Sequence, residues 1–378
     1  MIFIIISHFL ADFFVSVFKP LGPYFIERFS IEPRTFVMVL TILSFASSVM
    51  QPLFGRLADA ISWKYLYVVL TLLLIFLGSS SIGIAGKFEI VAVLILITLL
   101  SNSAYHPMGA SLIGEFGKSK YLAFFVFSGS LGAATGPFFI SWFVERFKLV
   151  YFSIVGISMS VLILVFFVFK IRKLETGRKY EQRKVEKPSL EAIASIIPIF
   201  LFVAFRSFFS SVASIYLPIY MKNLGVDMTL IGLTLSLGLW SGMFVSILGN
   251  HLRDVFGNVF VNLLSVSGML AFSLILSLES HNVRVIIGSY ITMVSFVFLS
   301  MSSNVVEAQR KAPNNKAFAS SLVMGMAWST GSLMNFIYSY FMGNNVEFMI
   351  KSLWIIALIT FIFIWFEGKM SWNSSDQI

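Results

Sequence analysis

Long apolar stretches recur along the whole chain and constrain its fold more than any other feature. A membrane-spanning helix needs about 20 mostly apolar residues. About twelve such stretches can be drawn: 2–26, 35–55, 65–85, 88–113, 120–144, 149–170, 190–221, 228–249, 258–278, 284–308, 316–342 and 348–366. Only 12% of the 378 residues are charged, against roughly a quarter in soluble domains. The pattern predicts an all-α integral membrane protein with twelve transmembrane helices.

Composition also limits the chemistry that the chain can perform. There is no cysteine, which excludes disulfide frameworks and thiolate metal sites. The four histidines show no metal-ligand spacing, and neither His-Glu-x-x-His nor Gly-x-Ser-x-Gly occurs. We therefore expect no metal, no cofactor and no enzymatic activity. The net charge of +9 is assigned to the loops of a membrane protein and not to nucleic-acid binding.

One long polar segment, 171–189, is dense in Lys and Arg and divides the chain. The sequence predicts an N-terminal six-helix bundle over 1–170, this basic linker, and a C-terminal six-helix bundle over 190–378. With both termini inside, the loops on the inner side hold the excess of Lys and Arg, which marks the cytoplasmic side. We expect a multi-pass protein of the cytoplasmic (plasma) membrane whose termini and linker are cytoplasmic.

The two halves repeat one another. The stretch from Pro23 to Asp59 aligns without a gap on the stretch from Pro218 to Asp254. Two six-span halves in parallel repeat, joined by a linker, are an arrangement found in secondary transporters. We therefore expect two pseudo-symmetric bundles around a central cavity.

A loop motif within this repeat points to a family. "GRLADAISWK" resembles the signature of the major facilitator superfamily between its second and third spans, matched by Gly55, Asp59 and Lys64. The second-half copy, "NHLRD", keeps Asp254. The resemblance implies a conformational latch, in which a carboxylate caps a helix N-terminus or pairs with a basic residue in one state only. A simple turn with a topology charge is the alternative.

A narrower resemblance covers most of the first half. "SHFLADFF", "QPLFGRLAD", "AYHPMGASL" and "SGSLGAATGP" occur in the order seen in the fosmidomycin-resistance branch, which exports drugs in exchange for protons. That branch usually has Glu after its His-Pro pair, where this chain has Met108. "GAATGP" also resembles the antiporter signature. For Gly132, Gly136 and Pro137 we expect helix packing, because small residues let helices approach closely.

Ionisable residues inside spans are costly and are therefore functional candidates. They are few in this chain: His8, Asp12, Lys19, His106, Arg206 and Glu307. All fall on spans 1, 4, 7 and 10, which the resemblance implies are the helices that line the central cavity. We expect Lys19 to extend towards the outer surface instead.

Two pairs of these residues have helical spacing. His8 and Asp12 lie at i and i+4 on one helix face, and a carboxylate among moving charges can load and release a proton. We predict proton coupling through Asp12, His8 and His106, with a static structural His8–Asp12 pair as the alternative. Asn102 and His106 share a face in the same way, so His106 is a proton relay, a substrate donor or a structural residue.

The remaining polar residues are assigned to the substrate. Arg206 presents a fixed fork of donors and suits either a counter-charge for Asp12 or a clamp for an anionic compound. Asn102, His106 and Glu307 complete the predicted substrate-binding set, although Glu307 near Arg310 is equally well explained as a surface charge.

Together these observations predict a secondary active transporter. We expect a monomer that exports a small drug-like or anionic compound by alternating access, in exchange for protons and within the lipid bilayer. Uptake or facilitated passage of a metabolite by the same fold is the alternative, followed by a membrane-embedded receptor or enzyme.

Overall fold

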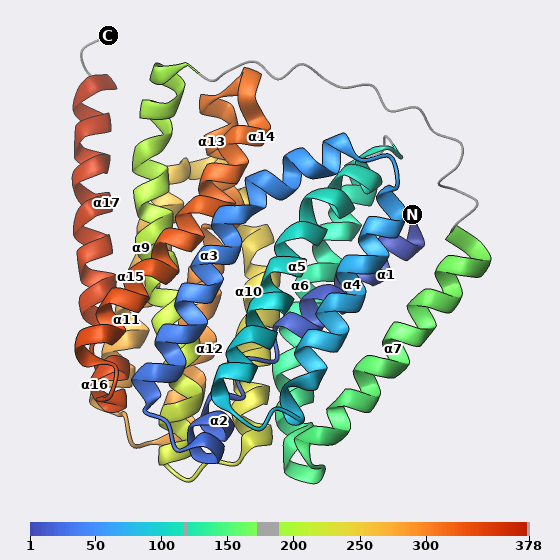
Figure 1. Cartoon of the computed structure of the whole chain (residues 1–378). Coiled ribbons are helices and arrows are strands. Elements are labelled where there is room, and N and C mark those ends of the chain that lie inside the picture. Colours follow the sequence, from blue (N-terminus) through green and yellow to red (C-terminus); the bar gives the residue numbers. More distant parts are fainter. Residues whose placement is uncertain (117–118, 172–188, 376–378) are drawn as a thin grey trace. The chain divides into compact units, whose positions relative to one another are not determined.

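The chain folds into long helices, as Figure 1 shows for a computed structural model. The structure describes residues 1–116, 119–171 and 189–375, and none of these residues lies in a β-strand. The helices before the linker are α1 (Ile2–Val15), α2 (Gly22–Phe29), α3 (Pro33–Ala60), α4 (Lys64–Ser80), α5 (Phe88–Gly114), α6 (Ser119–Arg146) and α7 (Phe152–Phe166).

The helices after the linker repeat this plan. They are α9 (Leu190–Asn223), α10 (Met228–Phe256), α11 (Asn258–Leu278), α12 (Val283–Leu299), α13 (Met301–Lys311), α14 (Lys316–Ser320), α15 (Ala327–Met342), α16 (Val346–Lys351) and α17 (Leu353–Ser375). Short 3-10 turns (81–83, 149–151, 313–315) and π-helical turns (167–171, 321–326) extend or connect them.

Ten of the described helical stretches are long and apolar enough to cross a membrane. α3 and α6 have 28 residues each, which at 1.5 Å per residue gives about 40 Å and exceeds the hydrocarbon thickness of about 30 Å. The two other predicted spans, 2–26 and 316–342, are helical but interrupted. The predicted all-α membrane fold is confirmed.

The first predicted span, 2–26, is helical but interrupted. α1 ends at Val15, a turn follows, and α2 begins at Gly22. The reason is local: Pro20 and Pro23 cannot donate backbone hydrogen bonds, and the residue before a proline is disfavoured in helical conformation. Pro23 is tolerated because it lies in the first turn of α2, where no donor is needed.

The eleventh predicted span, 316–342, is built from three pieces. α14 is followed by a π-helical stretch, Ser321–Met326, and then by α15. π-helical turns inside helices are uncommon and often lie at functional sites.

The chain divides into two compact units. The first comprises residues 1–31, 42–184 and 227–236, and the second 32–41, 185–226 and 237–378. The exchanged segments, 32–41 and 227–236, correspond to each other under the shift that aligns the two sequence repeats. The predicted linker falls almost wholly outside the described residues, so its boundaries stay a prediction.

Candidate functional site

Three ionisable side chains meet inside the first unit. His8 and Asp12 lie one turn apart on α1, and His106 reaches them from α5. One oxygen of Asp12 lies 3.2 Å from Nε2 of His8, and the other lies 3.2 Å from Nε2 of His106. The two imidazoles also approach each other, with Nε2 of His8 3.2 Å from Nδ1 of His106. We call these three residues the His–Asp cluster.

His8 is held from two sides by Phe125 of α6. Its Nδ1 lies 2.6 Å from the Phe125 carbonyl oxygen, and its ring stacks on the Phe125 ring with centroids 3.9 Å apart. Because a carbonyl oxygen can only accept, Nδ1 must carry the hydrogen and donate it. His8 is 5% exposed, so this orientation is fixed by packing.

Asn102 closes the other side of the His–Asp cluster. Its Nδ2 lies 3.1 Å from Nε2 of His106 and 3.5 Å from the nearer oxygen of Asp12. The Asn102 carbonyl oxygen is buried and has no hydrogen-bond partner among the described residues. Buried polar atoms usually have a partner, so this atom is available to a bound molecule.

Sequence reasoning missed two residues that shape this cluster. Phe125 was missed because an apolar residue carries no chemical mark when it acts through its backbone carbonyl. Gly129 was missed because it acts only by lacking a side chain. A Cβ there would overlap the His8 ring and lie 2.6 Å from an Asp12 oxygen. The only signal for Gly129 was its place in the "SGSLGAATGP" segment.

The His–Asp cluster is also the one group of His, Asp and Glu side chains in the described segments that could hold a metal ion. One ligand atom from each residue lies within 4.8 Å of the others. The Phe125 carbonyl would orient His8 as outer-shell partners orient metal ligands. The sequence predicted no metal, and that expectation stays a prediction.

Glycines of α6 bring this helix against α1. A Cβ at Gly132 would overlap the carbonyl oxygen of Phe9, and one at Gly136 would overlap the Ser16 hydroxyl. The carbonyl of Pro137 lies where a Cβ at Gly232 of α10 would be. These contacts show that the backbone of α6 packs directly against its neighbours, which small residues permit.

Arg206 is buried in the second unit, whereas the residues of the His–Asp cluster belong to the first. Its side chain on α9 is 1% exposed, and its Nη1 donates to the Ser300 hydroxyl at 2.8 Å. The guanidinium also lies 5.9 Å from the Phe202 ring and 5.8 Å from the Trp328 ring. Its Nε has no hydrogen-bond partner, and no ion pair of Arg206 occurs among the described residues. The structure thus gives Arg206 a hydroxyl partner and no carboxylate within its unit.

The other predicted residues have local partners. Glu307 is buried, at 9% exposed, and accepts a hydrogen bond from the exposed Arg310 at 2.8 Å, one turn along α13. Lys64 pairs with Glu115 at 3.2 Å, and Asp254 pairs with its neighbour Arg253.

Of the predicted latch, only part can be placed. The backbone of Gly55 lies on α3, where an added Cβ would be 3.9 Å from Pro107. The side chain of Asp59 lies outside the described residues.

Comparison with known proteins settles the family. A model of the Major Facilitator Superfamily matches residues 4–336. The chain belongs to this superfamily. Its predicted resemblance to the fosmidomycin-resistance branch is supported by a relative in Escherichia coli K12, the fosmidomycin resistance protein. The two are 21% identical over 344 residues, covering 87% of this chain and 82% of that protein.

A second relative is the Bacillus subtilis transporter YhcA, 23% identical over 195 residues, which cover 50% of this chain and 35% of that protein. Among solved structures, a bacterial homologue of the lysosomal transporter Spinster, inward-facing and occupied, gives a TM-score of 0.75 at 12% identity, covering 97% of this chain and 95% of that one. The nucleoside transporter NupG gives 0.73 at 14% identity, covering 96% and 98%. These structures share the fold.

The superfamily member described here is therefore a multi-pass membrane transporter and not an enzyme. It moves a small molecule across a membrane by alternating access, in which a binding site opens to one side at a time.

Proposed function

We propose that this transporter exports a small drug-like or anionic compound in exchange for protons, with the proton carried by the His–Asp cluster. The observation that carries the proposal is the double contact of the Asp12 carboxylate, with one oxygen at 3.2 Å from each imidazole. The name of the Escherichia coli relative, a fosmidomycin resistance protein, favours export of a drug-like compound.

The geometry at His8 requires a proton. Nδ1 keeps its hydrogen because it donates to the Phe125 carbonyl, so Nε2 carries a hydrogen only when the ring is positively charged. An ionised Asp12 beside a neutral His8 would set lone pairs against each other at 3.2 Å. One extra proton, on His8 or on Asp12, is needed to make this contact favourable.

The same proton balances charge inside the membrane. With it, a carboxylate and one imidazolium compensate each other; without it, Asp12 is an unpaired buried anion, which costs on the order of several kcal/mol. Release of the proton therefore favours a state in which water or a cation reaches Asp12. Since His8 and Asp12 lie on α1 and His106 on α5, a relative shift of these helices would link proton release to conformational change.

Substrate binding is assigned to Arg206, Asn102 and His106, with Glu307 as a weaker member. Arg206 supports an anionic substrate because its buried charge has no carboxylate partner among the described residues. Asn102 offers an unpartnered carbonyl oxygen beside the cluster. The distribution of Lys and Arg in its loops supports a plasma-membrane protein with cytoplasmic termini. The proposed transporter acts as a monomer.

The test uses purified protein in vesicles that enclose a pH-sensitive dye. A panel of anionic and amphipathic antibiotics, fosmidomycin included, is added with and without an imposed pH gradient. We expect at least one compound to drive proton movement opposite to its own. Asp12→Asn should abolish the coupled proton movement but retain exchange of the compound, and His106→Gln should shift its pH profile.

Glu89→Gln is the matched control, because Glu89 is an exposed carboxylate in the first turn of α5. It should behave as wild type. Coupled transport that survives in Asp12→Asn would contradict the proposal. Movement of compound and protons in the same direction would instead establish the uptake alternative.

A further inference from the structure

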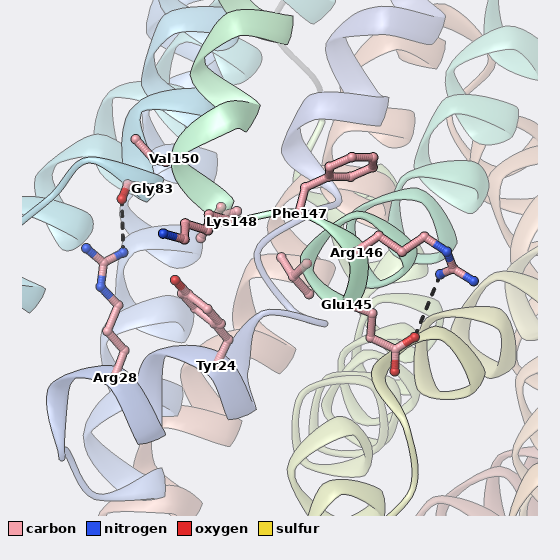
Figure 2. Close-up of a pocket in the computed structure, with 10 residues that line it drawn as sticks. Tyr24, Arg28, Gly83, Glu145, Arg146, Phe147, Lys148 and Val150 are labelled. Atoms are coloured by element: carbon pink, nitrogen blue, oxygen red, sulfur yellow. Dashed lines mark hydrogen bonds and ion pairs between the residues drawn. The ribbon is translucent and has the colours of Figure 1, made fainter.

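A second site lies at the ends of the first unit's helices and shares no residue with the His–Asp cluster. It is a cavity of about 520 Å³ between α2, the α4–α5 connection and the α6–α7 connection. Figure 2 shows Arg28, Lys148 and Tyr24 on one side of this cavity, with their polar ends turned towards one another. We call these three residues the cationic pocket.

Arg28 is fixed in place by backbone carbonyls. Its Nη1 donates to Gly83 at 3.0 Å and its Nη2 to Ala85 at 2.8 Å. Each of these nitrogens has a second N–H, and Nε has another, so three donors are left for a ligand. No ion pair neutralises Arg28 among the described residues, and two neutral carbonyls leave its charge in place.

Lys148 adds a second cation from a different segment. It is exposed and makes no ion pair within the described part of the chain. Glu145, the acid nearest in sequence, is directed elsewhere: its carboxylate accepts from Thr229 and lies 3.9 Å from Arg146. Figure 2 shows that Glu145 and Arg146 face away from Arg28 and Lys148. The pocket therefore carries an uncompensated double positive charge.

The backbone around the cavity is closely fitted. A Cβ at Gly83 would overlap the Leu149 carbonyl group, so only glycine lets the two connections approach this closely. Gly83 ends one candidate span and Arg146 ends another, and Leu149 begins a third. The cavity thus lies where spans leave the hydrocarbon, at the depth of lipid headgroups, and Tyr24 is an aromatic residue typical of that depth.

We propose that the cationic pocket binds a phosphate-ester anion. A phosphate group accepts several hydrogen bonds at once and pairs strongly with a guanidinium, which matches one arginine fork, one ammonium and one phenol hydroxyl. Two sources share this chemistry: the headgroup of an anionic phospholipid and a free phosphate ester. The lipid fits the apolar surface that continues from the pocket along α7, where Ile154, Ile157 and Val161 are more than half exposed.

The test measures binding to the purified full-length transporter in detergent. The probes are short-chain phosphatidylglycerol, short-chain phosphatidylcholine and glycerol phosphate, each titrated while the thermal unfolding temperature is followed. We expect phosphatidylglycerol to bind at least fivefold more tightly than phosphatidylcholine. Lys148→Gln should weaken phosphatidylglycerol about fivefold, the effect of one cation near a membrane surface. Arg28→Lys should also weaken phosphatidylglycerol binding, because lysine keeps the charge but lacks the paired N–H donors of the guanidinium.

Lys222→Gln is the control, because Lys222 is an exposed cation at the end of α9 that does not line the pocket. It should leave binding unchanged. Equal binding of glycerol phosphate identifies a free ester as the ligand, and binding of the lipid alone identifies a headgroup; both support the site. The proposal is overturned if none of the probes binds, or if Lys148→Gln binds as wild type, or if Lys222→Gln weakens binding as much as Lys148→Gln.

Discussion

A carboxylate in a membrane needs a partner for each oxygen, and Asp12 has two imidazoles. What makes these imidazoles different is the Phe125 carbonyl, which fixes the hydrogen on Nδ1 of His8. His106 has no such anchor to a backbone carbonyl among the described residues, and its Nδ1 faces His8 instead. The extra proton can therefore lie at His8 or at Asp12 without breaking the contact to Phe125.

Gly129 gives a sharp test at this scale. Gly129→Ala places a methyl group where the His8 ring lies and 2.6 Å from an Asp12 oxygen, so His8 must turn away or α6 must retreat. We expect pH-driven transport to fall at least tenfold in a folded protein, because a displacement of about 1 Å can cost a hundredfold in a positioned site. Gly288→Ala is the matched control, since nothing lies within 4 Å of its added Cβ. Undiminished transport by Gly129→Ala would contradict this geometry.

Arg206 offers a second test, which separates stability from function. A buried charge without a counter-charge keeps an uncompensated desolvation cost, so its replacement by an apolar side chain should stabilise the fold. We expect Arg206→Met to raise the unfolding temperature and to weaken binding of anionic substrates at least tenfold. Arg284→Met, at an exposed arginine, should change neither. A lower unfolding temperature in Arg206→Met would mean that the charge is structurally compensated.

At the scale of elements, the packing of α1, α5 and α6 against one another determines where the His–Asp cluster forms. α1 and α6 meet along Gly129, Gly132 and Gly136, so their backbones approach and carry His8 against Phe125. α5 meets this seam with His106, and Pro107 within α5 removes one backbone donor at the next position. Three helices therefore form the His–Asp cluster. α1 and α5 supply its side chains, and α6 supplies the Phe125 carbonyl and the glycines that let α1 approach.

The start of α3 carries a contact whose pH dependence can be derived. Glu32 accepts hydrogen bonds from Asn344 at 2.9 Å and from Arg34 at 3.0 Å. The Asn344 amide, and then Arg34, hold the pKa of the Glu32 carboxyl below its usual range. A carboxyl with a lowered pKa stabilises the fold above its usual pKa, and this contribution is lost as the pH falls through the lowered value.

The unfolding temperature of wild type minus that of Glu32→Gln should therefore be small, because Glu32 is exposed, and constant from pH 7 to about pH 5. It should vanish only at more acidic pH. Thermal unfolding of both proteins across this range measures it. A difference that vanishes between pH 7 and pH 6 would show that Glu32 is not held by these donors.

Helices could be predicted from sequence far better than their interruptions and contacts. Apolar length alone gave the membrane helices, because backbone groups in lipid must be satisfied within the segment. The break after Val15 was missed although Pro20 and Pro23 signal it, since apolar length was weighed above proline. The π-helical stretch at 321–326 has no comparable mark in the sequence.

The site was predictable in its titratable members and in Asn102, which helical spacing places beside His106. Asp12 and His106 were identified because an ionisable side chain inside a membrane is energetically costly and is retained for a function. Helical spacing put His8 beside Asp12. The convergence of His106 on them was not visible, because it depends on how α5 packs against α1. Phe125 and Gly129 were missed because a backbone carbonyl and a missing Cβ leave no chemical signature. The suggested pairing of Asp12 with Arg206 stays a prediction, and each has partners within its own unit.

At the scale of the whole molecule, the internal repeat has a structural counterpart. The first nine residues of α3, 33–41, belong to the second unit, and the equivalent first nine residues of α10, 228–236, belong to the first. Each segment is tied by side chains: Glu32 to Asn344, and Thr229 to Glu145. α3 and α10 therefore each continue from one unit into the other, while each tie lies within one unit, so relative motion of the units must either bend these helices or break the ties.

Cross-linking the second tie is the last prediction. The chain has no native cysteine, so a Thr229→Cys and Glu145→Cys pair can be bridged without side reactions. If α10 moves as one rigid helix with the second unit during alternating access, its first turns must separate from α6 in one state. We expect a short bridge between them to lower transport in vesicles at least tenfold and its reduction to restore the rate.

The control bridge joins Ser241→Cys of α10 to Ser295→Cys of α12, whose hydroxyls lie 2.8 Å apart within the second unit. Because this part of α10 and α12 both belong to the second unit, a rigid α10 that moves with that unit keeps the two residues together, and this bridge should leave transport unchanged. If the Thr229–Glu145 bridge forms fully and transport continues at the wild-type rate, the contact does not open during the cycle. The two exchanged segments would then be fixed parts of their units, and the motion would have to arise elsewhere along α3 and α10.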